Sequence, residues 1–210
     1  MRYNTLMKAE SVLPGWVLYF SEWEMKDPDA WDEDIIAETV EGLKREFAGR
    51  ELSADPVAKA VRKLFRQAGT DPTKYRPSFE ALARRVLKGE PFPCVHPAVD
   101  FSNILSLRWH VPCCVADREK VFPPVRMRVG ASGETVESLR GPFSLEGKVL
   151  MEDSQGIYST PITDSKRASV GPEARIVLFV AYFPEEGFDN AKTEQDLARL
   201  LPRAPVRVTG

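Results

Sequence analysis

The residue types most able to do chemistry are gathered in one short stretch. All three cysteines and both histidines fall within residues 94–114, and they are Cys94, His96, His110, Cys113 and Cys114. Thiolates and imidazoles are zinc ligands, and a Cys–His pair can also supply a nucleophile. The spacing C-x-H, followed much later by H-x-x-C-C, matches no known ligand-loop pattern, and a helix between the halves would hold them apart. We therefore predict buried thiols and ordinary imidazoles, with no cofactor and no structural metal. A zinc or thiol enzyme is the minor alternative.

A second set of candidates is basic. Lysines and arginines follow one edge of each of two predicted helices and the turn between them: Lys59, Arg62, Lys63, Arg66, Lys74, Arg76, Arg84, Arg85 and Lys88. A basic face of this kind can dock on phosphates while the rest of the molecule stays neutral. The alternative is an ordinary solvated helix face with charged partners one turn away, and composition alone favours that alternative.

A third set lies on a predicted helix over 97–109 that is apolar nearly all round. Asn103, Ser106 and His110 form a polar stripe on it, and Asp100 is a further candidate. A helix apolar on most faces is buried, so its polar stripe must find partners or face a cavity. An equal alternative is that Asn103 satisfies a loop backbone.

Composition limits the classes of protein that remain. The chain has 210 residues, 43% of them hydrophobic and 29% charged, with a formal net charge of −2. These values indicate a globular domain and exclude a strongly polybasic nucleic-acid binder. The longest apolar run, Ile176–Phe183, is far shorter than a membrane span needs. No signal peptide is visible, so we expect a cytoplasmic protein without a membrane partner. There is no glycine-rich phosphate loop, G-x-S-x-G or H-E-x-x-H motif.

Capping residues and apolar spacing predict the elements that must position these side chains. Helices are expected after Asp27-Pro28 up to Gly49, and over 54–68, 77–88, 97–109 and 191–201. Strands are expected over 12–20, 125–129, 147–152, 156–160, 175–183 and 206–208. Along the chain, the helices come first and most strands come later. This order predicts a single α+β domain, residues 1–210, with a helical N-terminal layer.

Several segments together are distinctive: DPTKYRPSFEALARRVLKG (71–89), VHPAVDFSNILSL (95–107), VPCCVAD (111–117), and DSKRA with RIVLFV (164–168 and 175–180). They resemble the stand-alone relatives of the editing (B3/B4) domain of the phenylalanyl-tRNA synthetase beta chain. The resemblance covers about residues 60–183. It implies a three-layer α/β fold with an unusual β-sandwich, in which 1–50 is an N-terminal extension, 51–185 the family-like core and 186–210 a C-terminal helix and tail.

In the synthetase this module hydrolyses tyrosine wrongly attached to the phenylalanine tRNA, because an apolar pocket cannot strongly reject an isostere that only adds a hydroxyl. The family's pocket asparagine matches Asn103. The family's histidine falls on Cys114, and the glutamate that contacts the tyrosine hydroxyl falls near Ser165. Two of three polar positions are changed, so specificity for tyrosine is not expected.

The resemblance therefore implies a module that binds aminoacyl-tRNA and could hydrolyse a mischarged aminoacyl ester. A non-catalytic module that binds RNA or an amino-acid-like small molecule is the alternative. No catalytic residue is assigned, and the oligomeric state is left open. The expected pocket residues are Asn103, Ser106, Cys114 and Ser165, with Lys166 and Arg167 holding phosphate or carboxylate. The expected tRNA contacts are Arg62, Lys63, Arg66, Lys74, Arg76, Arg84 and Arg85.

Overall fold

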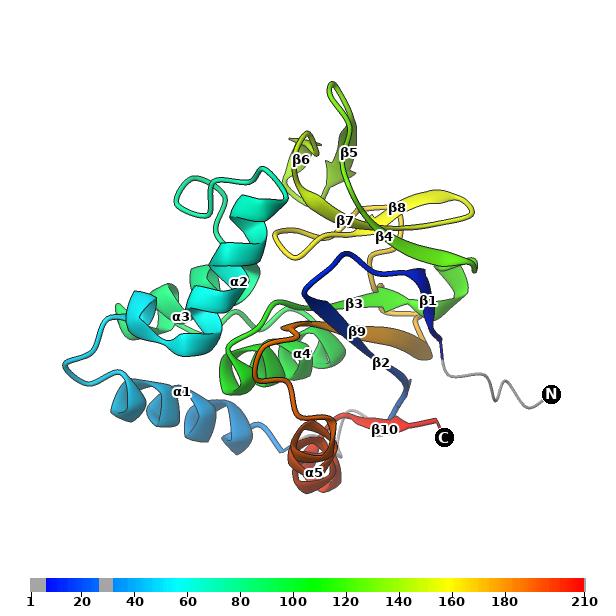
Figure 1. Cartoon of the computed structure of the whole chain (residues 1–210). Coiled ribbons are helices and arrows are strands. Elements are labelled where there is room, and N and C mark those ends of the chain that lie inside the picture. The colour runs from blue at the N-terminus through cyan, green and yellow to red at the C-terminus, as the bar shows by residue number, and fades with distance from the viewer. Residues whose placement is uncertain (1–6, 27–31, 210) are drawn as a thin grey trace.

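The computed structural model describes residues 7–26 and 32–209 (Figure 1). The helices within these ranges are α1 (Asp34–Glu46), α2 (Pro56–Gln67), α3 (Ser78–Leu87), α4 (Pro97–Trp109) and α5 (Asn190–Leu200). The strands are β1 (Ala9–Ser11), β2 (Trp16–Met25), β3 (Cys113–Asp117), β4 (Val125–Val129), β5 (Thr135–Ser138), β6 (Gly141–Ser144), β7 (Val149–Asp153), β8 (Gly156–Ser159), β9 (Ile176–Pro184) and β10 (Val206–Val208). The expected helix start at Asp27-Pro28 lies outside the described residues.

A four-stranded sheet in the order β10-β2-β9-β3 forms the centre of the fold. The predicted buried strand over 175–183 is confirmed as β9, which is buried along nearly its whole length and has a neighbour on each side. β2 pairs antiparallel with β9 from Trp16 to Glu24. The strand expected over 12–20 thus lies slightly further along the chain.

Capping residues begin two of these helices, and the cap at Asp55 is the predicted one. Asp55 begins α2, where its Oδ1 accepts the Ala58 N–H at 2.8 Å and Pro56 takes the first helical position. His96 begins α4, where its Nδ1 accepts the Ala98 N–H at 3.2 Å. The predicted helices over 54–68, 77–88 and 97–109 are confirmed as α2, α3 and α4.

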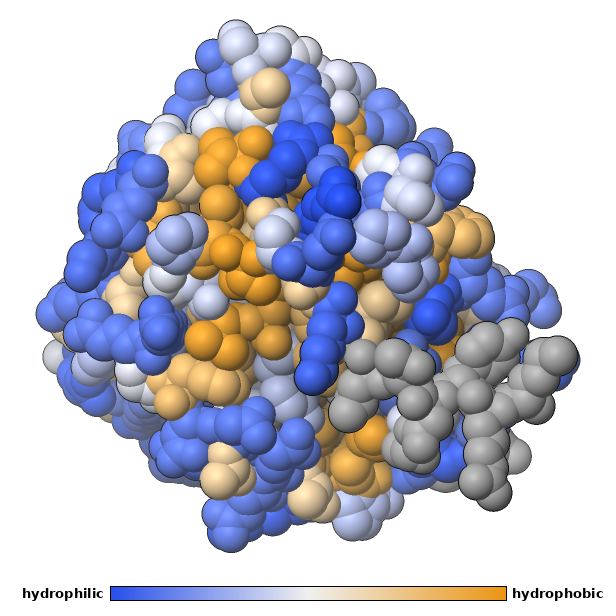
Figure 2. All heavy atoms as spheres, turned by 45° about the vertical axis from the view of Figure 1, so that its right-hand side comes forward, coloured by the Kyte–Doolittle hydropathy of each residue, from blue (hydrophilic) through white to orange (hydrophobic). Residues whose placement is uncertain are grey.

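The remaining strands form a second layer. β1, β4, β7 and β8 make another four-stranded sheet, and β5 and β6 form a separate hairpin. Figure 1 shows this sheet on the opposite side of the central sheet from α1 and α4. The fold is therefore α+β in three layers: helices, central sheet and second sheet. On the face drawn in Figure 2, hydrophobic patches are interrupted and bordered by hydrophilic side chains.

The core lies mainly between the central sheet and α4. Trp23 of β2 is fully buried, and its ring stacks on Phe179 of β9 with centroids 4.3 Å apart. In the described part of the chain, no helix is long and apolar enough to cross a membrane.

Candidate functional site

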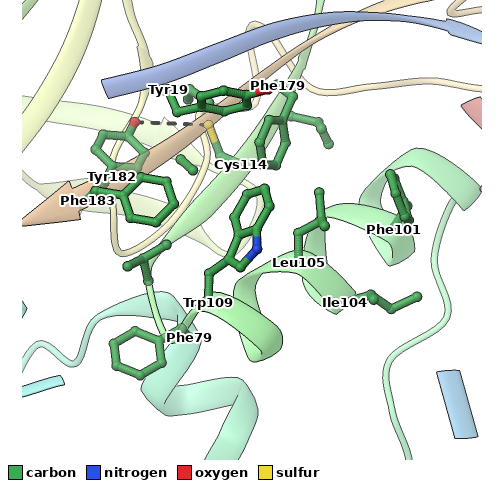
Figure 3. Close-up of a cluster of buried hydrophobic side chains, with 14 of the residues drawn as sticks. Tyr19, Phe79, Phe101, Ile104, Leu105, Trp109, Cys114, Phe179, Tyr182 and Phe183 are labelled. Atoms are coloured by element: carbon green, nitrogen blue, oxygen red, sulfur yellow. Dashed lines mark hydrogen bonds between the residues drawn. The ribbon is translucent and has the colours of Figure 1, made fainter. Parts of the chain in front are cut away.

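Cys114 lies at the centre of a buried polar cluster formed by neighbouring strands. Its Sγ is 2.8 Å from the Ser159 hydroxyl of β8, which in turn lies 2.6 Å from the Tyr182 hydroxyl of β9. Figure 3 shows the longer contact from Cys114 to Tyr182, beside the aromatic side chains of the core. All three side chains are buried, so each polar group depends on the others for its hydrogen bonds.

Asp164 completes this cluster. Burial raises the pKa of its carboxyl to about 7, while the hydrogen bond with the Cys114 thiol acts in the opposite direction. Burial also raises the pKa of Cys114 well above its ordinary value, so this thiol lacks the thiolate character of a nucleophile. The cluster consists of Cys114, Ser159, Asp164 and Tyr182. Among these four residues, only Asp164 can exchange a proton near neutral pH.

The sequence interpretation singled out Cys114 but missed its three partners. Asp164 directly precedes Ser165, the expected counterpart of the family glutamate. The Ser165 hydroxyl instead accepts the Arg167 backbone N–H at 3.2 Å. Ser159 and Tyr182 are ordinary strand residues, and only the pairing of β3 with β9 and the approach of β8 bring them to Cys114.

The other two expected pocket residues lie on α4. Asn103 is half-buried on this helix. Ser106 is buried, and its hydroxyl donates to the Val111 carbonyl at 2.7 Å. Ser106 therefore secures the turn that follows the helix.

Lys166 and Arg167 have different surroundings. The Lys166 side chain is exposed. The Arg167 guanidinium donates to the carbonyls of Lys120 and Gly156 at 2.8 and 3.0 Å, and it lies 3.0 Å from the Asp153 carboxylate. These contacts tie β7 and β8 of the second sheet to the turn that follows β3, so Arg167 has a structural role whether or not it also meets a ligand.

The basic residues of α3 gather around one surface cleft. A cavity of about 320 Å³ is lined by Arg76, Ala81, Arg84, Arg85, Lys88 and Glu90. The four basic side chains of this lining are exposed. Three of them, Arg76, Arg84 and Arg85, are expected tRNA contacts, and the structure brings them together at the cleft. Lys63, Arg66 and Lys74 are exposed as well.

Arg62 differs from the other basic residues. It is partly buried, and its guanidinium lies 2.8 Å from the carboxylate of Glu80 on α3, which is almost fully buried. Burial raises the pKa of Glu80, and the neighbouring arginines, Arg62 foremost, act against that rise. Arg62 therefore joins α2 to α3.

The five cysteines and histidines have separate surroundings. The prediction of buried thiols is wrong for Cys94, which is exposed at the surface; Cys113 is part-buried, and burial raises the pKa of both thiols. His96 caps α4, whereas His110 ends it and contacts Asp55 of α2.

The fold and the site define a three-layer α+β domain with a buried polar cluster and a basic cleft. The chain belongs to the B3/4 domain family, whose sequence model matches residues 60–199. Among solved structures, it is similar to an N-terminal fragment of the phenylalanyl-tRNA synthetase beta-subunit from Pyrococcus horikoshii, with 14% identity and a TM-score of 0.45. That match covers 97% of this chain and 52% of the fragment, so the chain spans about half the fragment's length.

The chain is also similar to the C-terminal domain of TilS, with 16% identity and a TM-score of 0.30, over 35% of this chain and 71% of that domain. No curated protein matches the sequence.

Proposed function

We propose that this B3/4 domain binds tRNA through a basic surface made of Arg76, Arg84, Arg85 and Lys88, extended by Lys63, Arg66 and Lys74. The observation that carries the proposal is the cleft beside α3, whose lining holds four cations and a single acid. A chain with a net charge of −2 has no general attraction for nucleic acid, so binding must come from such a local concentration of positive charge.

The geometry of the cleft suits a phosphate backbone. Arg84 and Arg85 are adjacent in the last turn of α3, and Arg76 precedes the helix. Guanidinium groups bind phosphate through paired, charge-assisted hydrogen bonds. Arg85 already donates to the Pro91 carbonyl at 2.8 Å, which fixes the side chain at the cleft and leaves further donors free for a phosphate.

A second candidate function, hydrolysis of a mischarged aminoacyl ester, is favoured by Asp164. A carboxyl with a pKa near 7 can take up and release a proton at the pH of the cell, as a general acid or base must. Cys114 stands where the resemblance places a histidine, so the preferred amino acid would not be tyrosine. A non-catalytic RNA-binding or amino-acid-binding module is the outcome if no hydrolysis occurs.

The binding proposal is tested with the Arg84→Ala/Arg85→Ala double variant. Both side chains are exposed, so the variant should fold normally yet bind tRNA at least tenfold more weakly, measured by fluorescence anisotropy. The matched control is Lys192→Ala/Arg199→Ala, which removes the same charge from exposed positions of α5. Equal affinity of the two double variants would refute the assignment of this surface.

The hydrolysis candidate is tested with a panel of mischarged tRNAs. Asp164→Asn should abolish any deacylation, and Asn103→Ala should alter it, while both variants keep the tRNA affinity of the unmodified chain. Rapid hydrolysis of the tyrosine ester on the phenylalanine tRNA would show that the comparison of Cys114 and Ser165 with the family residues is wrong. Absence of hydrolysis from every member of the panel would leave a binding module.

A further inference from the structure

His110 is held between two carboxylates from different helices. Its Nδ1 lies 3.2 Å from Asp55 Oδ2, at the start of α2, and its Nε2 lies 3.6 Å from Glu46 Oε2, at the end of α1. One ligand atom from each of these three residues lies within 4.8 Å of the others. His110 and Asp55 are buried, whereas the Glu46 side chain is half-exposed. The group thus reaches from the interior to the surface.

The backbone at His110 is unusual for a histidine. His110 follows the last residue of α4 with φ of 57°, in the left-handed region, and is the sole non-glycine residue of the described ranges with a positive φ. Glycine or asparagine is preferred at such a helix end. A histidine here costs backbone energy, which its side-chain contacts must offset.

Asp55 fixes the orientation of the imidazole. Asp55 Oδ1 accepts the Ala58 N–H, and Oδ2 accepts from His110 Nδ1, so both oxygens are engaged. With Nδ1 directed at Asp55, Nε2 is the ring nitrogen that faces the Glu46 carboxylate.

The outer ring nitrogen of His110 has no hydrogen-bond partner among the described residues. This Nε2 atom is buried, and at 3.6 Å it is too far from the Glu46 oxygen for a hydrogen bond. A cation held between Nε2 and the Glu46 carboxylate would give both atoms a partner. A buried polar atom left in this state calls for an unseen partner.

We propose that His110 and Glu46 bind a divalent transition-metal ion of the zinc type, with Asp55 as the positioning residue behind the imidazole. Two ligands of one tetrahedral zinc ion lie about 3.4 Å apart, close to the observed separation of Nε2 and Oε2. A carboxylate behind a metal-bound histidine is a recurring arrangement, because it fixes the tautomer and raises the basicity of the ligand.

The proposed ion would keep open coordination positions. His110 and Glu46 both line a cavity of about 280 Å³, which also includes Arg108, Phe188 and Asp196. Water or a small anionic group could therefore complete the coordination from the cavity side. This open site is distinct from the cysteine-containing structural metal site considered from the sequence, because it uses no thiolate.

Zinc chloride titrated into the metal-free full chain by calorimetry tests the proposal. One binding site is expected, and His110→Asn and Glu46→Gln should each weaken it at least tenfold. Asparagine tolerates the left-handed backbone at position 110, and Glu46 is at the surface, so both variants should fold, as thermal unfolding will show.

Asp55→Asn tests the positioning role separately. Asparagine caps a helix as well as aspartate does, so α2 should keep its stability. With Oδ1 still capping the helix, the amide NH₂ would face Nδ1 and move the imidazole proton to Nε2, where it blocks metal binding. Zinc affinity should fall by about 10- to 100-fold without a matching fall in the melting temperature.

Cys94→Ser/His96→Asn is the control for binding at the exposed thiol, and it should bind zinc as the unmodified chain does. Cobalt should bind to the unmodified chain without the thiolate charge-transfer absorption that cysteine ligands produce. No zinc binding by the unmodified chain, or binding unaffected by His110→Asn and Glu46→Gln, would overturn the proposal.

Discussion

At Cys114, the chemistry depends on which groups can carry charge. Its neighbours Ser159 and Tyr182 are buried hydroxyls, and burial raises the pKa of the thiol and of the Tyr182 phenol. Cys114, Ser159 and Tyr182 are therefore neutral at ordinary pH, and Asp164 is the member whose charge changes. Any acid–base chemistry of this cluster must pass through Asp164.

Asp164 should make stability depend on pH. Its pKa rises from 3.8 to about 7 on folding, so the protonated carboxyl stabilises the fold below about pH 4, and this contribution is lost as the pH rises through 7. Asp164→Asn is neutral throughout, so it should become more stable than the unmodified chain across this window, by at most about 4 kcal/mol. Urea unfolding at pH 4, 6 and 8 measures the difference. A difference that stays constant with pH would contradict the raised pKa.

The three thiols should differ in reactivity. Cys94 is exposed, whereas Cys114 is buried and Cys113 partly so, and burial raises the pKa of both. A thiol reagent should label Cys94 first in the folded protein and reach the other two only on unfolding. Cys94→Ser should remove the early phase. An early phase that persists in this variant would place a reactive thiol in the Cys113–Cys114 pair.

Among the elements, helices were easier to predict than strands. Asp55-Pro56 and the apolar stripe of α2 are local signals, and they locate that helix closely. β3 was not predicted, because Cys113 and Cys114 carry no strand signal of their own and the pairing with β9 stabilises the strand. The hairpin of β5 and β6 was missed for a similar reason: alternation is weak over such short segments.

The candidate site was only partly predictable for the same physical reason. The basic residues of α3 lie close together in sequence, so the helix period places them on one surface. Ser159, Asp164 and Tyr182 reach Cys114 from other strands and a loop, and the local sequence carries no signal for such long-range contacts. The Asp55–His110 contact joins two helix ends far apart in the chain and was likewise invisible.

The ion pair between α2 and α3 leads to a prediction at this scale. Arg62→Ala leaves the buried carboxylate of Glu80 without its partner, which should cost about 3–5 kcal/mol of unfolding free energy near pH 7. The loss should shrink at acid pH, where Glu80 is protonated, and also in a Glu80→Gln background. A double-mutant cycle by chemical denaturation measures it. A cost below about 1 kcal/mol in both backgrounds would mean that Arg62 is free to act as an RNA contact.

At the scale of the whole molecule, the N-terminal segment is part of the main sheet. β2 lies between β9 and β10, and it carries the buried Trp23 that stacks on Phe179. A chain that starts at residue 51 would lose this strand and expose one edge of β9. We expect it to lack a cooperative thermal transition. A cooperative transition near that of the full chain would show that residues 51–210 fold independently.

The central claim, a tRNA-binding surface at the α3 cleft, is tested most directly by the salt dependence of binding. Each phosphate neutralised on a duplex contributes about 0.9 to the slope of log affinity against log salt concentration. The unmodified chain should show a steep slope, and Arg84→Ala/Arg85→Ala should reduce it by about 2, whereas the Lys192→Ala/Arg199→Ala control should leave it unchanged. A slope near zero, or one that is the same in both double variants, would contradict the account.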